Sequence, residues 1–154
     1  MNLIAWSENL TPEAAKAAGA ILVSKDQLFE RADILTIHMV LSSRTRGLVG
    51  AAELERMKPT ALLINTSRGP IVEEQALIGV LKNKQIAGAA IDVFDIEPLP
   101  AAHPFRTLDN VLATPHIGYV SHGLYKTFYE DTVSNIRKWI EAHQNSAGTE
   151  EKNA

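Results

Sequence analysis

The sequence predicts an α/β protein built on a doubly wound parallel sheet, and three observations lead to this fold class. Short apolar segments of strand-like composition alternate along the chain with segments of helical periodicity. The segment ALLINT (61–66) is apolar at successive positions, as strands buried on both faces are. The 154 residues are 45% hydrophobic and 21% charged, which suffices for one domain with its own core. Right-handed crossovers would then place helices on both faces of the sheet.

The first part of the chain predicts two strands, each followed by a helix. Thr11 is a suitable N-cap, Pro12 suits the first helical position and Gly19 suits the helix exit. The expected order is strand 2–6, helix 11–19, strand 20–24 and helix 26–32.

The rest of the chain continues the alternation and ends in a long helix. Leu77, Val80 and Leu81 fall on one stripe of the helix over 73–83. Residues 144–154 are polar and lack periodicity, so we expect a flexible tail after a domain over 1–143. The expected elements are strand 33–39, helix 50–57, strand 61–66, helix 73–83, strands 87–94 and 110–114, and helix 121–143.

Composition excludes several classes of protein. The chain has no cysteine, which excludes disulfides and thiol catalysis. A net charge of −3 without a basic run argues against nucleic acid and anionic membranes as partners. No apolar run approaches the roughly 20 residues that span a bilayer, and the start of the chain lacks the pattern of a signal peptide. A soluble cytoplasmic protein is the simplest interpretation.

Polar side chains follow three of the predicted strands. Arg68 follows strand 61–66, Asp92 and Glu97 lie at and after the end of strand 87–94, and His116 follows strand 110–114. Ligands of parallel α/β sheets bind beyond the carboxyl ends of the strands. Arginine can grip a carboxylate through two parallel hydrogen bonds, histidine can exchange a proton near neutral pH, and a glutamate can orient the imidazole. This set could bind a 2-oxo acid and protonate the developing alkoxide.

Each of these residues also has a purely structural interpretation. Arg68 alone could be a surface arginine, and Asp92, Glu97 and His116 could be turn residues. Ser67 with Asp92 and His116 could suggest a hydrolase, but Ser67 does not lie in a G-x-S-x-G elbow. The five histidines form no H-E-x-x-H pair, so we expect no metal.

Three segments together resemble the D-isomer-specific 2-hydroxyacid dehydrogenases. LLINTSRGPIVEEQAL, GAAIDVFDIEPLP and NVLATPHIGY are similar to the three C-terminal signatures of this family, in the same order. The spacing of 24 residues from Arg68 to Asp92 and of 5 residues to Glu97 also fits. The resemblance covers about residues 2–143 and implies a Rossmann-like cofactor domain.

The resemblance assigns roles by position. Arg68 would bind the substrate carboxylate and carbonyl, His116 would be the proton donor and acceptor, and Glu97 would pair with it. Asp92 would lie beside the nicotinamide carboxamide. Val40 stands where the family usually has proline. The cofactor-binding surface would comprise Ser7, His38, Met39, Val40, Thr45, Thr66, Ser67, Arg68, Asp92, His116 and Gly118.

The Rossmann-like sheet is expected to be incomplete at its N-terminal side. The nine glycines form no G-x-G-x-x-G motif, the loop that cradles a cofactor pyrophosphate. By resemblance, the central first strand, its helix and most of the substrate domain are missing. The two strand edges beside the vacant position should then recruit other chains. We therefore expect a homo-oligomer, with strand exchange as one form.

The acidic residue that binds the ribose hydroxyls would usually stand at Ser7, so NAD and NADP both stay open, with a preference for NAD. The sequence thus favours an oxidoreductase that moves a hydride between NAD(H) or NADP(H) and a small 2-oxo or 2-hydroxy acid. Acids like phosphoglycerate, glyoxylate or hydroxypyruvate would be its substrates. The alternative is a truncated, catalytically incompetent fragment that serves only as a binding or assembly module.

Overall fold

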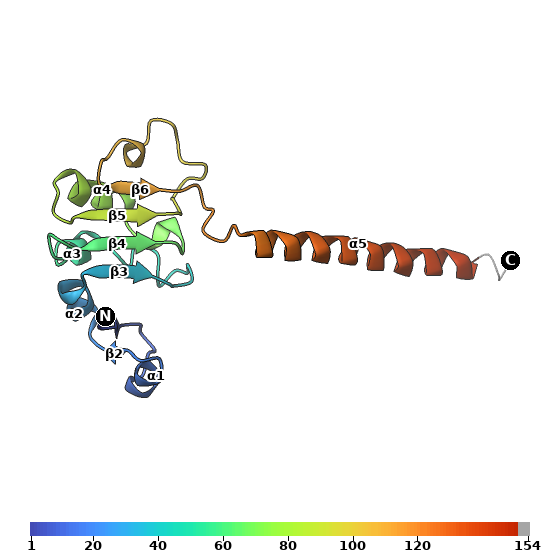
Figure 1. Ribbon diagram of the computed structural model, residues 1–154, viewed down its shortest axis with the longest axis horizontal. Helices are drawn as coiled ribbons and strands as arrows, with labels where there is room; N and C mark the ends of the chain where they lie inside the picture. The colour runs from blue at the N-terminus through green and yellow to red at the C-terminus, as the bar shows by residue number, and fades with distance from the viewer. Residues whose placement is uncertain (151–154) are drawn as a thin grey trace. The chain divides into compact units, whose positions relative to one another are not determined.

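The computed structural model describes residues 1–150, and side chains as far as residue 144. The chain divides into two compact units, residues 1–118 and residues 119–154. All strands belong to the first unit (Figure 1). Its elements are β1 (Ile4–Ala5), α1 (Pro12–Ala17), β2 (Ile21–Leu22), α2 (Lys25–Arg31), β3 (Ile34–Ile37), α3 (Ala51–Leu54), β4 (Leu62–Asn65), η1 (Gly69–Ile71), α4 (Glu74–Lys82), β5 (Gly88–Ile91), η2 (Pro104–Arg106) and β6 (Val111–Ala113).

Local sequence signals fix the helix ends. The Thr11 side chain accepts a hydrogen bond from Ala14 N at 3.2 Å, and Gly19 leaves α1 with φ +73°. Both features confirm the predicted cap and exit of this helix. Helix α3 ends at Leu54, so its predicted end at residue 57 was wrong. Pro59 disfavours helical backbone at the residue before it, and residues 55–57 form a turn instead.

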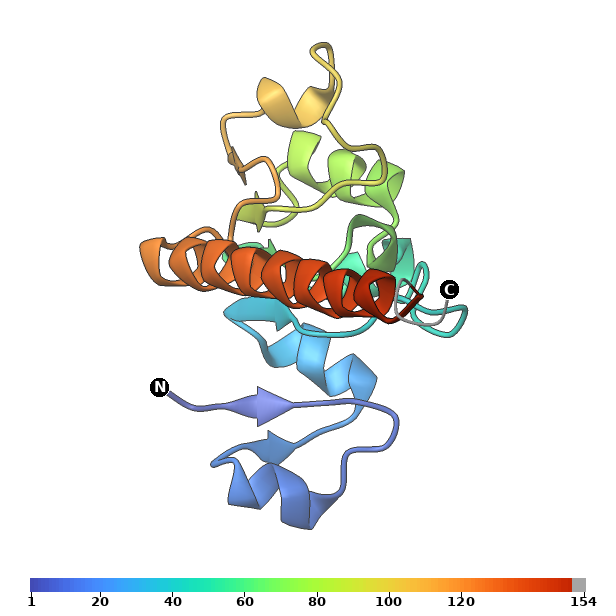
Figure 2. The ribbon, with the colours of Figure 1, turned by 90° about the vertical axis from the view of Figure 1, so that its right-hand side faces the viewer.

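The strands form two parallel sheets. One contains β1 and β2, and the other has the order β3-β4-β5-β6. The parallel Rossmann-like arrangement is confirmed. In both views β1 is the strand of the smaller sheet nearer to β3 (Figures 1 and 2), yet no strand pairing joins the two sheets in the described part of the chain.

Helices cover only one face of the four-stranded sheet within residues 1–118. Helices α3 and α4 lie on the same side of it (Figure 2), and Leu63, Ile91 and Leu77 of α4 belong to one buried hydrophobic core. The predicted stripe of α4 is confirmed, because Leu77, Val80 and Leu81 are all buried. On the other face Ile34, Leu62 and Leu112 are 56%, 42% and 66% exposed. Coverage of both faces, as the sequence suggested, is therefore not found in this unit.

The register of the sheet aligns the carboxyl ends of its strands. Ile37, Asn65, Ile91 and Ala113 form one row across β3, β4, β5 and β6. The residues that follow this row leave the sheet at a common edge. This edge carries the polar residues that the sequence singled out.

The second unit consists mainly of α5 (His122–Glu150). The helix extends past residue 143, where the sequence placed its end, and residues 151–154 lie outside the described residues. Its apolar side chains are exposed: Leu124, Tyr125, Phe128, Tyr129, Val133, Ile136, Trp139 and Ile140. In the described part of the chain, no helix combines the length and apolarity that crossing a membrane requires.

Candidate active site

Arg68 lies on a turn that hydrogen bonds of the Asn65 side chain stabilise. Asn65 ends β4, is 2% exposed, and accepts a hydrogen bond from Ser67 N at 3.1 Å while its amide donates to Arg68 O at 3.0 Å. The Ser67 hydroxyl donates to Ile37 O at 2.6 Å, which ties the turn to the end of β3. One arm of the Arg68 guanidinium donates to Ser67 O at 2.6 Å. The backbone thus fixes an exposed arginine directly beyond the sheet edge.

Asp92 organises the loop that carries His116. Its carboxylate accepts hydrogen bonds from the Thr114 hydroxyl at 2.6 Å, from Ile117 N at 2.9 Å and from Gly118 N at 2.8 Å. His116 lies inside this loop with φ +57°, a left-handed conformation that costs about 1–2 kcal/mol for a residue other than glycine. The three hydrogen bonds flank that residue, so the buried carboxylate holds the strained turn in place.

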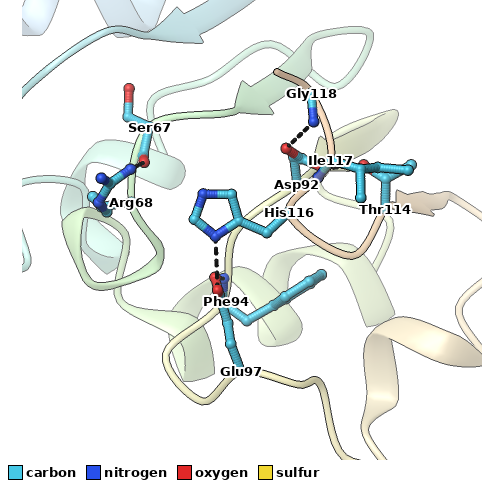
Figure 3. A network of polar contacts seen from close by, with 9 residues as sticks. All are labelled: Ser67, Arg68, Asp92, Phe94, Glu97, Thr114, His116, Ile117 and Gly118. Carbon is cyan, nitrogen blue, oxygen red and sulfur yellow. Dashed lines mark hydrogen bonds and ion pairs between the residues drawn. The ribbon is translucent and has the colours of Figure 1, made fainter. Parts of the chain in front are cut away.

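His116 and Glu97 form an ion pair at the centre of the site. Nδ1 of His116 lies 2.7 Å from Oε2 of Glu97, and the other carboxylate oxygen accepts from Phe94 N at 2.9 Å (Figure 3). An ionised carboxylate only accepts hydrogen bonds, so Nδ1 carries the hydrogen. The contact with Glu97 thereby sets the ring orientation and the tautomer of His116.

The surroundings of Asp92 and Glu97 favour the ionised form of both carboxylates. Burial alone would raise the pKa of Asp92, but the hydrogen bonds from Thr114, Ile117 and Gly118 outweigh it and lower that pKa. Burial likewise opposes ionisation of Glu97, whose pKa is nevertheless lowered by the hydrogen bonds from His116 and Phe94 and by the charges of His116 and Arg68. The charge of Arg68 therefore acts on the same carboxylate that His116 contacts.

The structure therefore brings the predicted catalytic trio to one edge of the sheet. In Figure 3 the His116 ring extends from the β6 side towards the Arg68 turn, and Glu97 reaches the ring from its own loop. Thr66 and Ser67 precede Arg68 on the turn, and Gly118 donates to Asp92. These residues all follow β4, β5 and β6 at the same edge of the sheet.

The other predicted cofactor residues follow β3 and β1. His38, Met39 and Val40 leave the sheet after β3, and the Thr45 hydroxyl closes their loop by donating to Val40 O at 2.7 Å. Gly47 N donates to Pro70 O at 2.9 Å, so this loop also contacts the segment after Arg68. Ser7 follows β1 in the separate two-stranded sheet, and no hydrogen bond among the described residues links it to the trio.

Sequence reasoning missed two residues of the site, Asn65 and Thr114. Asn65 shapes the Arg68 turn, and Thr114 donates to Asp92. The available signal for Asn65 was a polar residue at the end of an otherwise apolar strand, which must find partners when buried.

Acid should weaken the domain through Asp92. Its pKa is lowered in the folded state, so its contribution to stability is complete above the unfolded value of about 3.9 and is lost as pH falls through the folded value. We expect the free energy of unfolding in urea to drop below about pH 4, and Asp92→Asn to flatten that drop and lower stability at pH 7. Asp109→Asn is the control, because its carboxylate is exposed and weakly paired. A profile that Asp92→Asn leaves unchanged would refute this role.

Comparison with known proteins identifies relatives for most of the chain. Residues 1–118 match a family described as "D-isomer specific 2-hydroxyacid dehydrogenase, NAD binding domain". The chain is 43% identical over 124 residues to glyoxylate/hydroxypyruvate reductase B of Enterobacter agglomerans, covering 80% of this chain and 38% of the relative. It is 39% identical over 137 residues to D-3-phosphoglycerate dehydrogenase of Synechocystis sp., covering 89% of this chain and 24% of the relative.

Solved structures agree with this similarity. Phosphoglycerate oxidoreductase from Vibrio cholerae O395 superposes with a TM-score of 0.84 at 35% identity, over 92% of this chain and 46% of that one. A D-isomer specific 2-hydroxyacid dehydrogenase from Xanthobacter autotrophicus Py2, in complex with NADPH and MES, gives a TM-score of 0.62 at 38% identity, over 64% of this chain and 33% of that one. The chain therefore spans less than half the length of each of these relatives.

Proposed function

The chain belongs to the D-isomer specific 2-hydroxyacid dehydrogenase family, and from that premise we propose that it takes part in hydride transfer between a nicotinamide cofactor and a small 2-oxo or 2-hydroxy acid. The observation that carries the proposal is the 2.7 Å contact between Glu97 and His116, at the same sheet edge as Arg68. Acids like glyoxylate, hydroxypyruvate or phosphoglycerate fit it, because reductases and dehydrogenases named for such acids are among the relatives.

The residues present fit the nicotinamide end of the cofactor. A carboxylate offers about four acceptor positions, and three donors occupy those of Asp92. One position is left for the carboxamide N–H of a nicotinamide, beside the proposed acid–base group. The sequence contains no G-x-G-x-x-G loop to cradle the pyrophosphate. NAD is preferred, in line with the description of the family, and NADP stays open.

The chemistry divides between the cofactor and this chain. A bound reduced nicotinamide supplies the hydride to the C2 carbon. Arg68 would grip the substrate carboxylate with its planar fork and orient the carbonyl. Nε2 of His116 would give its proton to the oxygen as the alkoxide develops, while Glu97 accepts from Nδ1 and holds the ring. In the reverse direction the same nitrogen takes the proton from the hydroxyl.

Substitution of Arg68 tests the proposal. NADH and NADPH are titrated by fluorescence, and reduction of glyoxylate, hydroxypyruvate and pyruvate is followed. Arg68→Ala should lower kcat/KM by about tenfold to a hundredfold, mainly through KM, because a charge-assisted hydrogen bond contributes about 1.5–3 kcal/mol. Arg68→Lys keeps the positive charge but loses the planar guanidinium fork. Its kcat/KM should therefore lie between those of the unmodified chain and Arg68→Ala. If the unmodified chain binds neither cofactor and reduces none of these acids, the enzymatic proposal fails, and the binding or assembly module becomes the better description.

The open sheet edges support a homo-oligomer. Among the described residues, β1 pairs only with β2, and β3 pairs only with β4. Asp33 O accepts from Leu62 N, so by alternation Thr36 directs its backbone groups to the open edge of β3. We expect sedimentation to show a dimer or larger species. Thr36→Pro should shift it towards monomer, because proline removes a donor from that edge, whereas Thr36→Ala should not. A wild-type monomer at all concentrations would contradict this.

A further inference from the structure

The segment that carries Glu97 is a loop without regular secondary structure. It follows β5 and ends at the 3₁₀ helix η2. Both oxygens of Glu97 are engaged, one by Phe94 N and the other by His116. A loop that shifted by even one ångström would break one of these hydrogen bonds, so something must hold the loop against the rest of the domain.

The end of this loop is anchored to helix α4 through His103. Phe105 N donates to Nδ1 of His103 at 3.3 Å, so Nε2 carries the ring hydrogen and donates to Oε1 of Glu74 at 3.1 Å. The two side chains are only 12% and 18% exposed. The His103 ring also packs on Phe105, with centroids 4.8 Å apart, and Phe105 belongs to the hydrophobic core.

The middle of the loop is anchored by Arg106. Its Nη2 donates to Leu99 O at 2.7 Å and its Nε donates to Pro100 O at 3.0 Å. These carbonyls lie two and three residues after Glu97, so one guanidinium bridges two successive peptide groups of the loop. Leu99 itself packs against the core. Arg106 follows His103 on η2, and the two anchors therefore share one rigid turn.

We propose that Arg106 and the Glu74–His103 pair are positioning residues that fix the Glu97 loop and thereby the contact between Glu97 and His116. The inference rests on the proposed function, because the contact matters for turnover only if His116 moves a proton. The charges of His116 and Arg68 act on Glu97, and those of Glu74, Arg46 and His103 act on Asp95 in the same loop. The hydrogen bonds of Arg106, His103 and Glu74 among the described residues do not reach His116, so their effect passes through the loop.

Carbon-13 NMR titration of the Glu97 carboxyl group tests the proposal without any need for turnover. The full chain is compared with Arg106→Ala and His103→Asn, and Glu97→Gln assigns the signal. In each variant the midpoint of the titration should rise by about half a pH unit, because a looser loop weakens the hydrogen bonds that keep Glu97 ionised. Arg106→Lys should recover part of the change. Arg31→Ala removes an exposed arginine from α2 and should leave the midpoint unchanged.

Urea unfolding of each variant separates positioning from general loss of stability. If Arg106→Ala or His103→Asn fails to fold, Arg106→Gln and Glu74→Gln are measured in its place. A midpoint that stays at the wild-type value in folded variants of both anchors overturns the proposal. If the midpoint moves in a chain without turnover, the anchors are supported and the proposed function fails. If the midpoint does not move in an active chain, the proposed function is supported and the role of the anchors fails.

Discussion

Replacing His116 with glutamine should reduce kcat/KM for 2-oxo acid reduction by about 10²–10⁴, the usual contribution of a positioned general acid. Glutamine keeps a polar side chain but cannot exchange a proton, whereas His116 presents an imidazole whose Nδ1 is held by Glu97 at 2.7 Å. Because His116 is also expected on the cofactor-binding surface, NADH affinity is followed by fluorescence, and its loss should be much smaller than the loss in kcat/KM. A selective loss in the chemical step would identify His116 as the proton donor.

The control for this substitution is His143→Gln. His143 lies on α5, and its Nδ1 contacts Trp139 O within the same helix. Its replacement removes a histidine of the same kind from a place without a role in the mechanism. Equal losses in the two variants, or a wild-type rate in His116→Gln, would remove His116 from the proposed mechanism.

The fold was predictable from sequence as far as local signals determine it. The order of strands and helices follows from apolar periodicity and from caps such as Thr11. The sequence contains no G-x-G-x-x-G motif, which agrees with two described sheets that no strand pairing joins. Coverage of both sheet faces was not predictable in the same way. Apolar residues on both sides of a strand such as β4 permit both faces to be buried but do not ensure that both are. Leu62 remains exposed on one face of the sheet.

The site was predictable in its chemistry and less so in its geometry. Arg68, Glu97 and His116 were found because charged residues that follow apolar strands stand out. The left-handed backbone of His116 and its support by Asp92 were not visible, since they depend on hydrogen bonds between loops that are 22–26 residues apart. The role of Asn65 was hidden for a similar reason, because a buried amide is recognised only once its partners are known.

The turn that carries Arg68 and the segment that leads to Glu97 are in close contact at Gly69. A Cβ atom added at this residue would overlap the backbone carbonyl of Phe94 and lie 2.7 Å from Asp95 N. Phe94 is the residue whose amide donates to Glu97. Only glycine therefore lets the turn that carries Arg68 pack directly on the segment that leads to Glu97.

Gly69→Ala should consequently destabilise the domain by about 1–3 kcal/mol, the usual cost of overpacking, as measured by urea unfolding. It should also lower turnover, because the Arg68 turn and the Glu97 loop must move apart to admit the methyl group. Gly79→Ala is the matched control. Gly79 lies within α4 and a Cβ there would meet no atom within 4 Å, so alanine should stabilise the helix by about 0.5–1 kcal/mol. If both substitutions stabilise the protein, the two turns are not held at the distance on which the proposed chemistry depends.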